Sequence, residues 1–89
     1  MARPRIVITG LGGICALGTG VQAMWEAMRE GRPAIGPITT TETRDLKIGP
    51  VAEIKALPEH GIEHRRLVTM DRFSLLAVLA AREAFAQSG

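Results

Sequence analysis

A short apolar run followed by clustered glycines, at residues 5–18, constrains the fold more than any other feature of this sequence. The run Ile6–Thr9 is β-branched and shows no polar alternation, which predicts a strand covered on both faces, as in a parallel sheet. Glycine allows the positive φ or the close backbone approach that a tight turn requires. A structural turn is therefore predicted at Gly10, Gly12, Gly13 and Gly18.

A first helix is predicted to follow this turn. Thr19 and Gln22 have the spacing of a capping box, in which each side chain bonds an amide at the start of the helix. Gly31 is placed to end the helix, and Pro33 prevents its resumption. Apolar residues recur at i, i+3, i+4 and i+7, which predicts one stripe packed on the sheet; they are Val21, Met24, Trp25 and Met28.

The middle of the chain predicts little regular structure. Residues 32–45 are rich in Pro, Gly and Thr, a composition typical of an irregular surface connection. Residues 47–54 are compatible with a short strand, which Gly49 and Pro50 restrict to an edge or a bulge. Residues 57–64 contain Pro58 and Gly61 and are predicted to form a loop.

The last segment, residues 70–87, is predicted to form a long helix. It contains no Gly or Pro, Thr69 can cap it, and Asp71 lies in the first turn, where a carboxylate is favoured. The helix is apolar nearly all round, so burial on several sides is expected. Because 89 residues can hardly bury both this helix and the first strand, the sequence predicts a piece of a larger structure.

Composition excludes several classes of protein. A net charge of +2, with Lys and Arg spread along 89 residues, argues against a nucleic-acid-binding protein. One cysteine excludes an internal disulfide framework and suits a reducing cytoplasm. The longest uncharged apolar run, residues 73–81, is far shorter than the ~20 residues of a membrane span, and no signal peptide is recognisable.

The glycine turn also invites comparison with the dinucleotide-binding fingerprint G-x-G-x-x-G. Gly10 and Gly12 fit its first two positions, but Cys15 takes the third. The acidic residues at about the required distance, Glu26 and Glu30, fall on the predicted helix rather than at the end of a second strand. A structural turn is therefore favoured over a phosphate site.

The nucleophilic and metal-ligating residue types do not assemble into a site. Cys15 follows a glycine turn, but no local base accompanies it, so a small buried thiol is favoured over a nucleophile. His60 and His64 have i, i+4 spacing, yet Gly61 weakens any helix that would align them and no further ligand completes a set. We expect a solvated loop and no metal site.

The densest basic cluster precedes the final helix at His64, Arg65 and Arg66. Two interpretations remain open. The cluster can be ordinary surface charge, or it can be a docking patch for an acidic partner, where exposed charges mainly raise the association rate.

Two stretches in order give the chain a family resemblance. Residues 5–13 (Arg-Ile-Val-Ile-Thr-Gly-Leu-Gly-Gly), continuing through Leu17-Gly18 to Trp25 and Gly31, resemble the N-terminus of the β-ketoacyl-acyl-carrier-protein synthases. Residues 70–74 (Met-Asp-Arg-Phe-Ser), with residues 80–84 and Ser88-Gly89, resemble the next helix of that family. Residues 11–18 and 28–38 are most similar to the rhizobial nodulation protein E branch.

The resemblance implies a fold and a reaction. The fold is α/β and thiolase-like, with layers α-β-α-β-α in a homodimer, of which residues 1–89 would be a partial N-terminal domain. The reaction passes an acyl group to a cysteine thiolate and condenses it with malonyl-carrier protein; no cofactor is implied. The family's Thr-Ala-Cys-Ser, His-Gly-Thr-Gly-Thr and Gly-His-Thr motifs are absent here, so no catalytic residue is expected in this chain.

One functional surface can carry over from the resemblance. Family members often place basic residues just before the Met-Asp-Arg-Phe helix to meet the acidic acyl carrier protein; Arg65 matches such a position best, with Arg66 beside it. Val68 and Thr69 stand where further basic residues are often found. We therefore expect the N-terminal part of a cytoplasmic synthase; the alternative is a non-catalytic scaffold or carrier-protein-binding module.

Overall fold

The computed structural model describes residues 3–39 and 49–89, so the end of the predicted connection and the start of the predicted second strand lie outside the described residues. Two helices of 10 and 17 residues account for most of the regular structure, and the strands are two residues long. In chain order the elements are β1 (Ile14–Cys15), β2 (Gly18–Thr19), α1 (Val21–Glu30), β3 (Ile35–Gly36), β4 (Val51–Ala52), α2 (His64–Leu67) and α3 (Arg72–Ser88).

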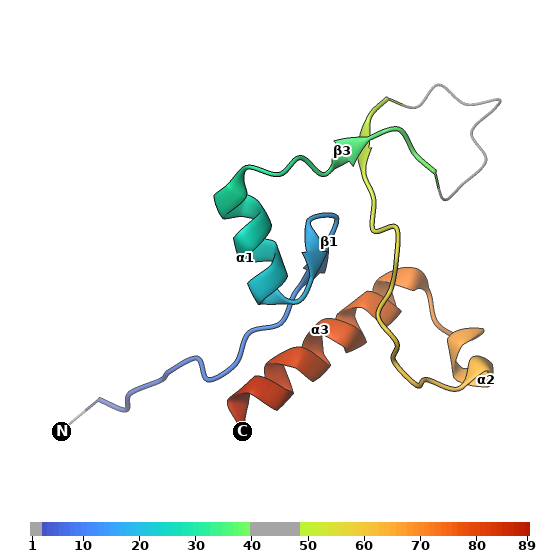
Figure 1. Cartoon of the computed structure of the whole chain (residues 1–89). Coiled ribbons are helices and arrows are strands. Elements are labelled where there is room, and N and C mark those ends of the chain that lie inside the picture. The colour runs from blue at the N-terminus through green and yellow to red at the C-terminus, as the bar shows by residue number, and fades with distance from the viewer. Residues whose placement is uncertain (1–2, 40–48) are drawn as a thin grey trace.

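The prediction of a buried strand at residues 6–9 is wrong for this structure. The segment runs as an irregular extended chain away from the helices (Figure 1) and belongs to neither two-stranded sheet. Ile6 is 93% exposed and Ile8 is 80% exposed. A strand requires a neighbour that pairs with its backbone, and no described residue pairs with this segment.

The glycine-rich stretch instead forms a small hairpin. β1 pairs with β2 in antiparallel register, with Ile14 opposite Thr19 and Cys15 opposite Gly18. The Gly20 amide donates to the Gly13 carbonyl at 2.9 Å, which closes the base of the hairpin. α1 and α3 lie on either side of this hairpin (Figure 1).

The predicted bounds of the first helix are confirmed. Gly31 adopts the left-handed conformation at φ 71° and donates its amide to the Met28 carbonyl at 3.1 Å. The following residue, Arg32, donates to the Ala27 carbonyl at 2.9 Å. Such paired bonds satisfy the last carbonyls of a helix, and only glycine takes this conformation without a steric penalty.

Two details predicted for α1 are wrong. Gly20 is the N-cap and no side chain within the helix start caps it, so Thr19 and Gln22 do not form a capping box. The buried position is Ala27, whereas Trp25 and Met28 are 55% and 60% exposed. The face turned inward thus keeps Val21 and Met24 of the predicted stripe, which are half-buried, and uses Ala23 and Ala27 in place of Trp25 and Met28.

The short strand predicted between residues 47 and 54 is confirmed at β4. It pairs with β3 in antiparallel register, Ile35 opposite Ala52 and Gly36 opposite Val51. The connection that the sequence predicts to be irregular therefore contains two residues of strand. Residues 57–63 have no regular structure, as predicted, and α2 begins at His64.

The long C-terminal helix is confirmed, with a different start and a different environment. Asp71 is the N-cap of α3, while the Thr69 hydroxyl donates to the Arg66 carbonyl at 2.8 Å rather than capping α3. The expected burial is wrong in this structure: Leu75 is the buried residue of α3, and Phe73 and Phe85 are 72% and 81% exposed.

None of the helices formed by residues 3–39 and 49–89 combines the length and apolarity that crossing a bilayer requires.

Candidate functional site

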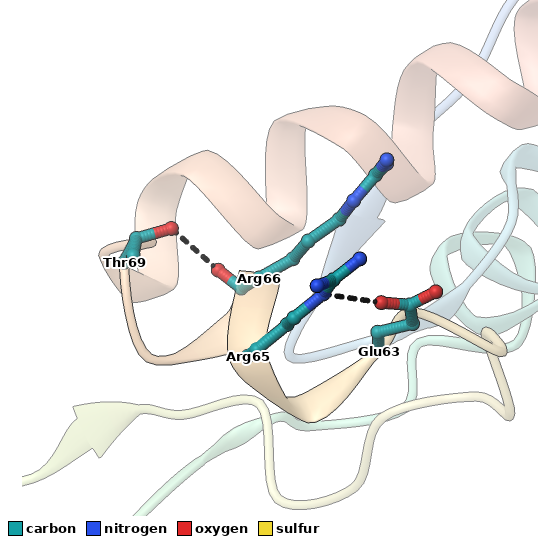
Figure 2. A network of polar contacts seen from close by, with 4 residues as sticks. All are labelled: Glu63, Arg65, Arg66 and Thr69. Atoms are coloured by element: carbon teal, nitrogen blue, oxygen red, sulfur yellow. Dashed lines mark hydrogen bonds and ion pairs between the residues drawn. The ribbon is translucent and has the colours of Figure 1, made fainter.

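The basic cluster lies on α2, the short helix before α3. Amides of Arg66 and Leu67 donate to the Glu63 carbonyl at 2.9 and 3.1 Å. The Thr69 amide and hydroxyl both reach the Arg66 carbonyl, at 3.1 and 2.8 Å (Figure 2). These bonds hold the single turn in place between two irregular segments.

The two arginines of this turn differ in their partners. The Arg65 Nε donates to Glu63 Oε2 at 2.8 Å, with both side chains largely exposed. Such a surface ion pair contributes only about 0–1 kcal/mol. Within the described ranges no carboxylate pairs with Arg66, and Figure 2 shows both arginine side chains extending in the same direction. Among the described residues, Arg65 is thus paired with a carboxylate and Arg66 is not.

Two other arginines form hydrogen bonds with backbone carbonyls of a distant segment. Arg72 Nη2 donates to the Ile54 carbonyl and Arg82 Nη1 donates to the His60 carbonyl, each at 2.6 Å. Both residues belong to α3, so these bonds tie the segment after β4 to that helix. Charge-assisted bonds of this kind are stronger than neutral ones, which makes these two cations anchors for the chain.

The predicted turn glycines lie against two helices. A Cβ added to Gly10 or Gly12 would collide with the backbone of Ala84 or Ala80 on α3. A Cβ added to Gly13 would come within 2.9 Å of the Met24 sulfur on α1. At Gly18 the neighbour is the Ala23 methyl, at 3.0 Å.

Two side chains of α3, which sequence reasoning missed, bond this loop. Glu83 Oε1 accepts the Gly13 amide at 2.9 Å and Oε2 accepts the Val21 amide at 3.0 Å. One turn later, Gln87 Oε1 accepts the Leu11 amide at 2.6 Å. A signal for this contact existed: alanines at 80 and 84 beside Glu83 and Gln87 mark a face on which glycines can pack closely.

Cys15 and the two histidines do not come together. Cys15 is half-buried in β1, and its sulfur accepts the Leu17 amide at 3.4 Å. His60 Nδ1 accepts the Ile62 amide at 3.1 Å, and His64 opens α2. Among the residues that the structure describes, no group of His, Cys, Asp or Glu has the arrangement of a metal site.

An open pocket of about 430 Å³ lies between the hairpin and the segment after β4. Its lining includes Cys15, Glu53 and Lys55. Glu53 is already engaged, because it accepts the Thr39 amide at 2.9 Å and the Thr39 hydroxyl at 2.6 Å. The hydrogen bond described for the Cys15 sulfur comes from the Leu17 backbone amide and not from either of these side chains.

Comparisons with known proteins identify relatives of this chain. The family model for the β-ketoacyl synthase N-terminal domain matches residues 3–89. The chain is 64% identical over 85 residues to nodulation protein E of Rhizobium sp., covering 96% of this chain and 21% of that protein. It is 58% identical over 85 residues to nodulation protein E of Rhizobium leguminosarum bv. trifolii, with the same coverage.

A more distant relative is 3-oxoacyl-[acyl-carrier-protein] synthase 2 of Synechocystis sp., at 34% identity over 85 residues, 94% of this chain and 20% of that protein. No solved structure matches the chain at a significant level. The chain spans about a fifth of the length of the curated relatives that it matches.

Proposed function

Because the chain belongs to the β-ketoacyl synthase family, we propose that it forms the N-terminal part of a condensing enzyme that elongates acyl groups with malonyl-acyl carrier protein. The observation that carries the proposal is the family match over residues 3–89, together with relatives whose names denote synthases of this type. Higher identity to nodulation proteins E favours a specialised acyl chain over the common fatty acids.

In this proposal the reaction itself belongs to the complete enzyme. The family's cysteine elbow and both histidine motifs are absent from the sequence, and the hydrogen bond described for the Cys15 sulfur comes from a backbone amide rather than from a base. A thiol needs such a base, or a lowered pKa, to act as a nucleophile at neutral pH. The chain supplies part of a thiolase-like scaffold, and the complete enzyme is a cytoplasmic homodimer.

The chain also supplies a contact for the acyl carrier protein. Arg65 and Arg66 precede α3 on an exposed turn, and Arg66 lacks a carboxylate partner among the described residues. An acidic carrier would be attracted to this turn, chiefly by a faster encounter. The turn glycines serve packing in the same proposal, because each lies against a neighbouring helix.

The exposed apolar surface favours an enzyme part over a self-sufficient scaffold. Large apolar side chains at positions 6, 8, 73 and 85 are at least 72% exposed, which is expected if further parts of a larger enzyme cover them. An isolated chain of this kind should bind ANS and unfold without a cooperative transition. A sharp, cooperative unfolding of the chain would instead support the scaffold or carrier-binding module.

Assaying the 89-residue chain for condensation of acyl- and malonyl-carrier protein tests directly whether the catalytic residues lie in the rest of the enzyme. We expect no turnover above the protein-free rate, both for the chain and for its Cys15→Ala variant. Turnover that depends on Cys15 would overturn the assignment of the chemistry to the rest of the enzyme.

A further inference from the structure

The Glu83 carboxylate joins three segments that are distant in the sequence. It projects from α3, is half-buried, and accepts the Gly13 amide with one oxygen and the Val21 amide with the other, at 2.9 and 3.0 Å. These partners are 70 and 62 residues away. Both oxygens of one carboxylate are therefore engaged by backbone donors of the loop that precedes α1.

The Val21 amide lies at the start of α1, where backbone donors lack acceptors. Val21 is the first residue of α1, and amides in the first turn of a helix have no acceptor within the helix. Side-chain caps normally satisfy them, yet α1 has none of its own. A carboxylate at this end is also favoured by the helix dipole, so Glu83 supplies from α3 what the start of α1 lacks.

A second side chain, one turn further along α3, bonds the same loop. Gln87 accepts the Leu11 amide and Glu83 accepts the Gly13 amide, so alternate residues of the loop meet acceptors four residues apart on the helix. Side chains four apart lie on the same face of a helix. The approach is close because Gly10 and Gly12 leave no side chain between the loop and the α3 backbone.

We propose that Glu83 is the internal anionic ligand of the glycine loop, occupying the amides that a phosphate group would otherwise use. Glycine loops before a helix bind phosphate through such free amides. Here a carboxylate of the same chain already accepts them, so an external anion would have to displace Glu83. This role is independent of the proposed enzymatic function.

Glu83 accepts hydrogen bonds with both carboxylate oxygens, whereas a glutamine side chain has only one acceptor oxygen. In Glu83→Gln the amide group would place an N–H donor against a backbone donor. We expect hydrogen exchange at Gly13 or Val21 to accelerate about tenfold or more, since leaving a donor unsatisfied is costly. Mass spectrometry with residue-level fragmentation measures it in a chimera in which this chain replaces the matching first fifth of Rhizobium sp. nodulation protein E. Glu63→Gln, at an exposed position just before α2, makes the same charge change away from the loop and should leave both amides unaffected. Equal exchange in the two variants would overturn the proposal.

A small acid should replace the missing side chain. In Glu83→Ala, added sodium formate or inorganic phosphate should slow exchange at Gly13 and Val21, with no such effect on the unaltered chimera. Absence of this rescue would contradict the assignment of an anion site. The unaltered chimera gives a test that does not depend on variant folding: the Gly13 and Val21 amides should exchange more slowly than the amide of Glu59, which lies at an exposed loop position, and equal rates would refute the contact.

Discussion

At the scale of single residues, the two arginines proposed for docking differ, because Arg66 has no carboxylate partner among the described residues. Arg65 shares its charge with Glu63 at 2.8 Å, whereas Arg72 and Arg82 are bonded to backbone carbonyls. The sequence alone identified Arg65 and Arg66 as one cluster, because both are adjacent and basic. The family resemblance favoured Arg65 over Arg66, but it could not predict the ion pair of Arg65, which depends on how the chain turns at Glu63.

This difference gives a prediction for carrier docking. We consider a chimera in which this chain replaces the matching first fifth, about 21%, of the Rhizobium sp. nodulation protein E. Arg66→Glu should slow association with acyl carrier protein more than Arg65→Glu, and both should flatten its salt dependence. Stopped-flow association rates at two ionic strengths measure this. Arg29→Glu, an exposed position on α1, is the matched control; if all three variants have the same rate, the turn is not the docking site.

The role of Glu83 could not be predicted from the sequence. Sequence patterns identify caps that lie within a few residues of a helix start, and they favoured Thr19 for α1. The group that bonds the Val21 amide comes from a helix 62 residues later. Local patterns carry no information on such a partner until the packing of α3 on the glycine loop is known.

At the scale of elements, local signals predicted the helices and failed for the first strand. α1 ends at Gly31 because glycine takes the left-handed conformation there, and this requirement is written into the sequence. Residues 6–9 have the composition of a strand, but strand formation depends on a pairing neighbour. None of the described residues provides one, so composition alone overestimated the order of this segment.

The contact between the glycine loop and α3 makes Gly12 a sensitive position. An added Cβ would lie 2.7 Å from the Ala80 carbonyl carbon, and backbone cannot give way cheaply. We expect Gly12→Ala to destabilise the folded state by about 1–3 kcal/mol, the usual range for overpacking. Urea unfolding of the chimera measures this change.

The control for this prediction is Gly36→Ala, because nothing lies within 4 Å of a Cβ added there and its φ is not positive. That variant should unfold within about 0.5 kcal/mol of the parent, as surface substitutions usually do. Equal losses at the two positions would show that the loop does not pack on α3.

For the whole molecule, the extended shape is the most informative property. The radius of gyration is 16.9 Å, against about 12 Å expected for a compact domain of this length. Ala27 and Leu75 are the buried apolar residues among those described. The apolar composition predicted a piece of a larger structure, and the exposed side chains agree with that prediction. In the proposed complete enzyme, further elements would cover these side chains, and local patterns in this sequence cannot identify them.

At the scale of the whole molecule, our central proposal is that this chain is the N-terminal part of a condensing enzyme. The most direct test is the condensation of acyl- and malonyl-carrier protein by the same chimera. Turnover by the chimera within about tenfold of the intact nodulation protein E, a factor equivalent to about 1.4 kcal/mol of transition-state free energy, is the result we expect, with none from the 89-residue chain alone. A chimera that folds and dimerises like the intact protein yet gives no turnover would contradict the account.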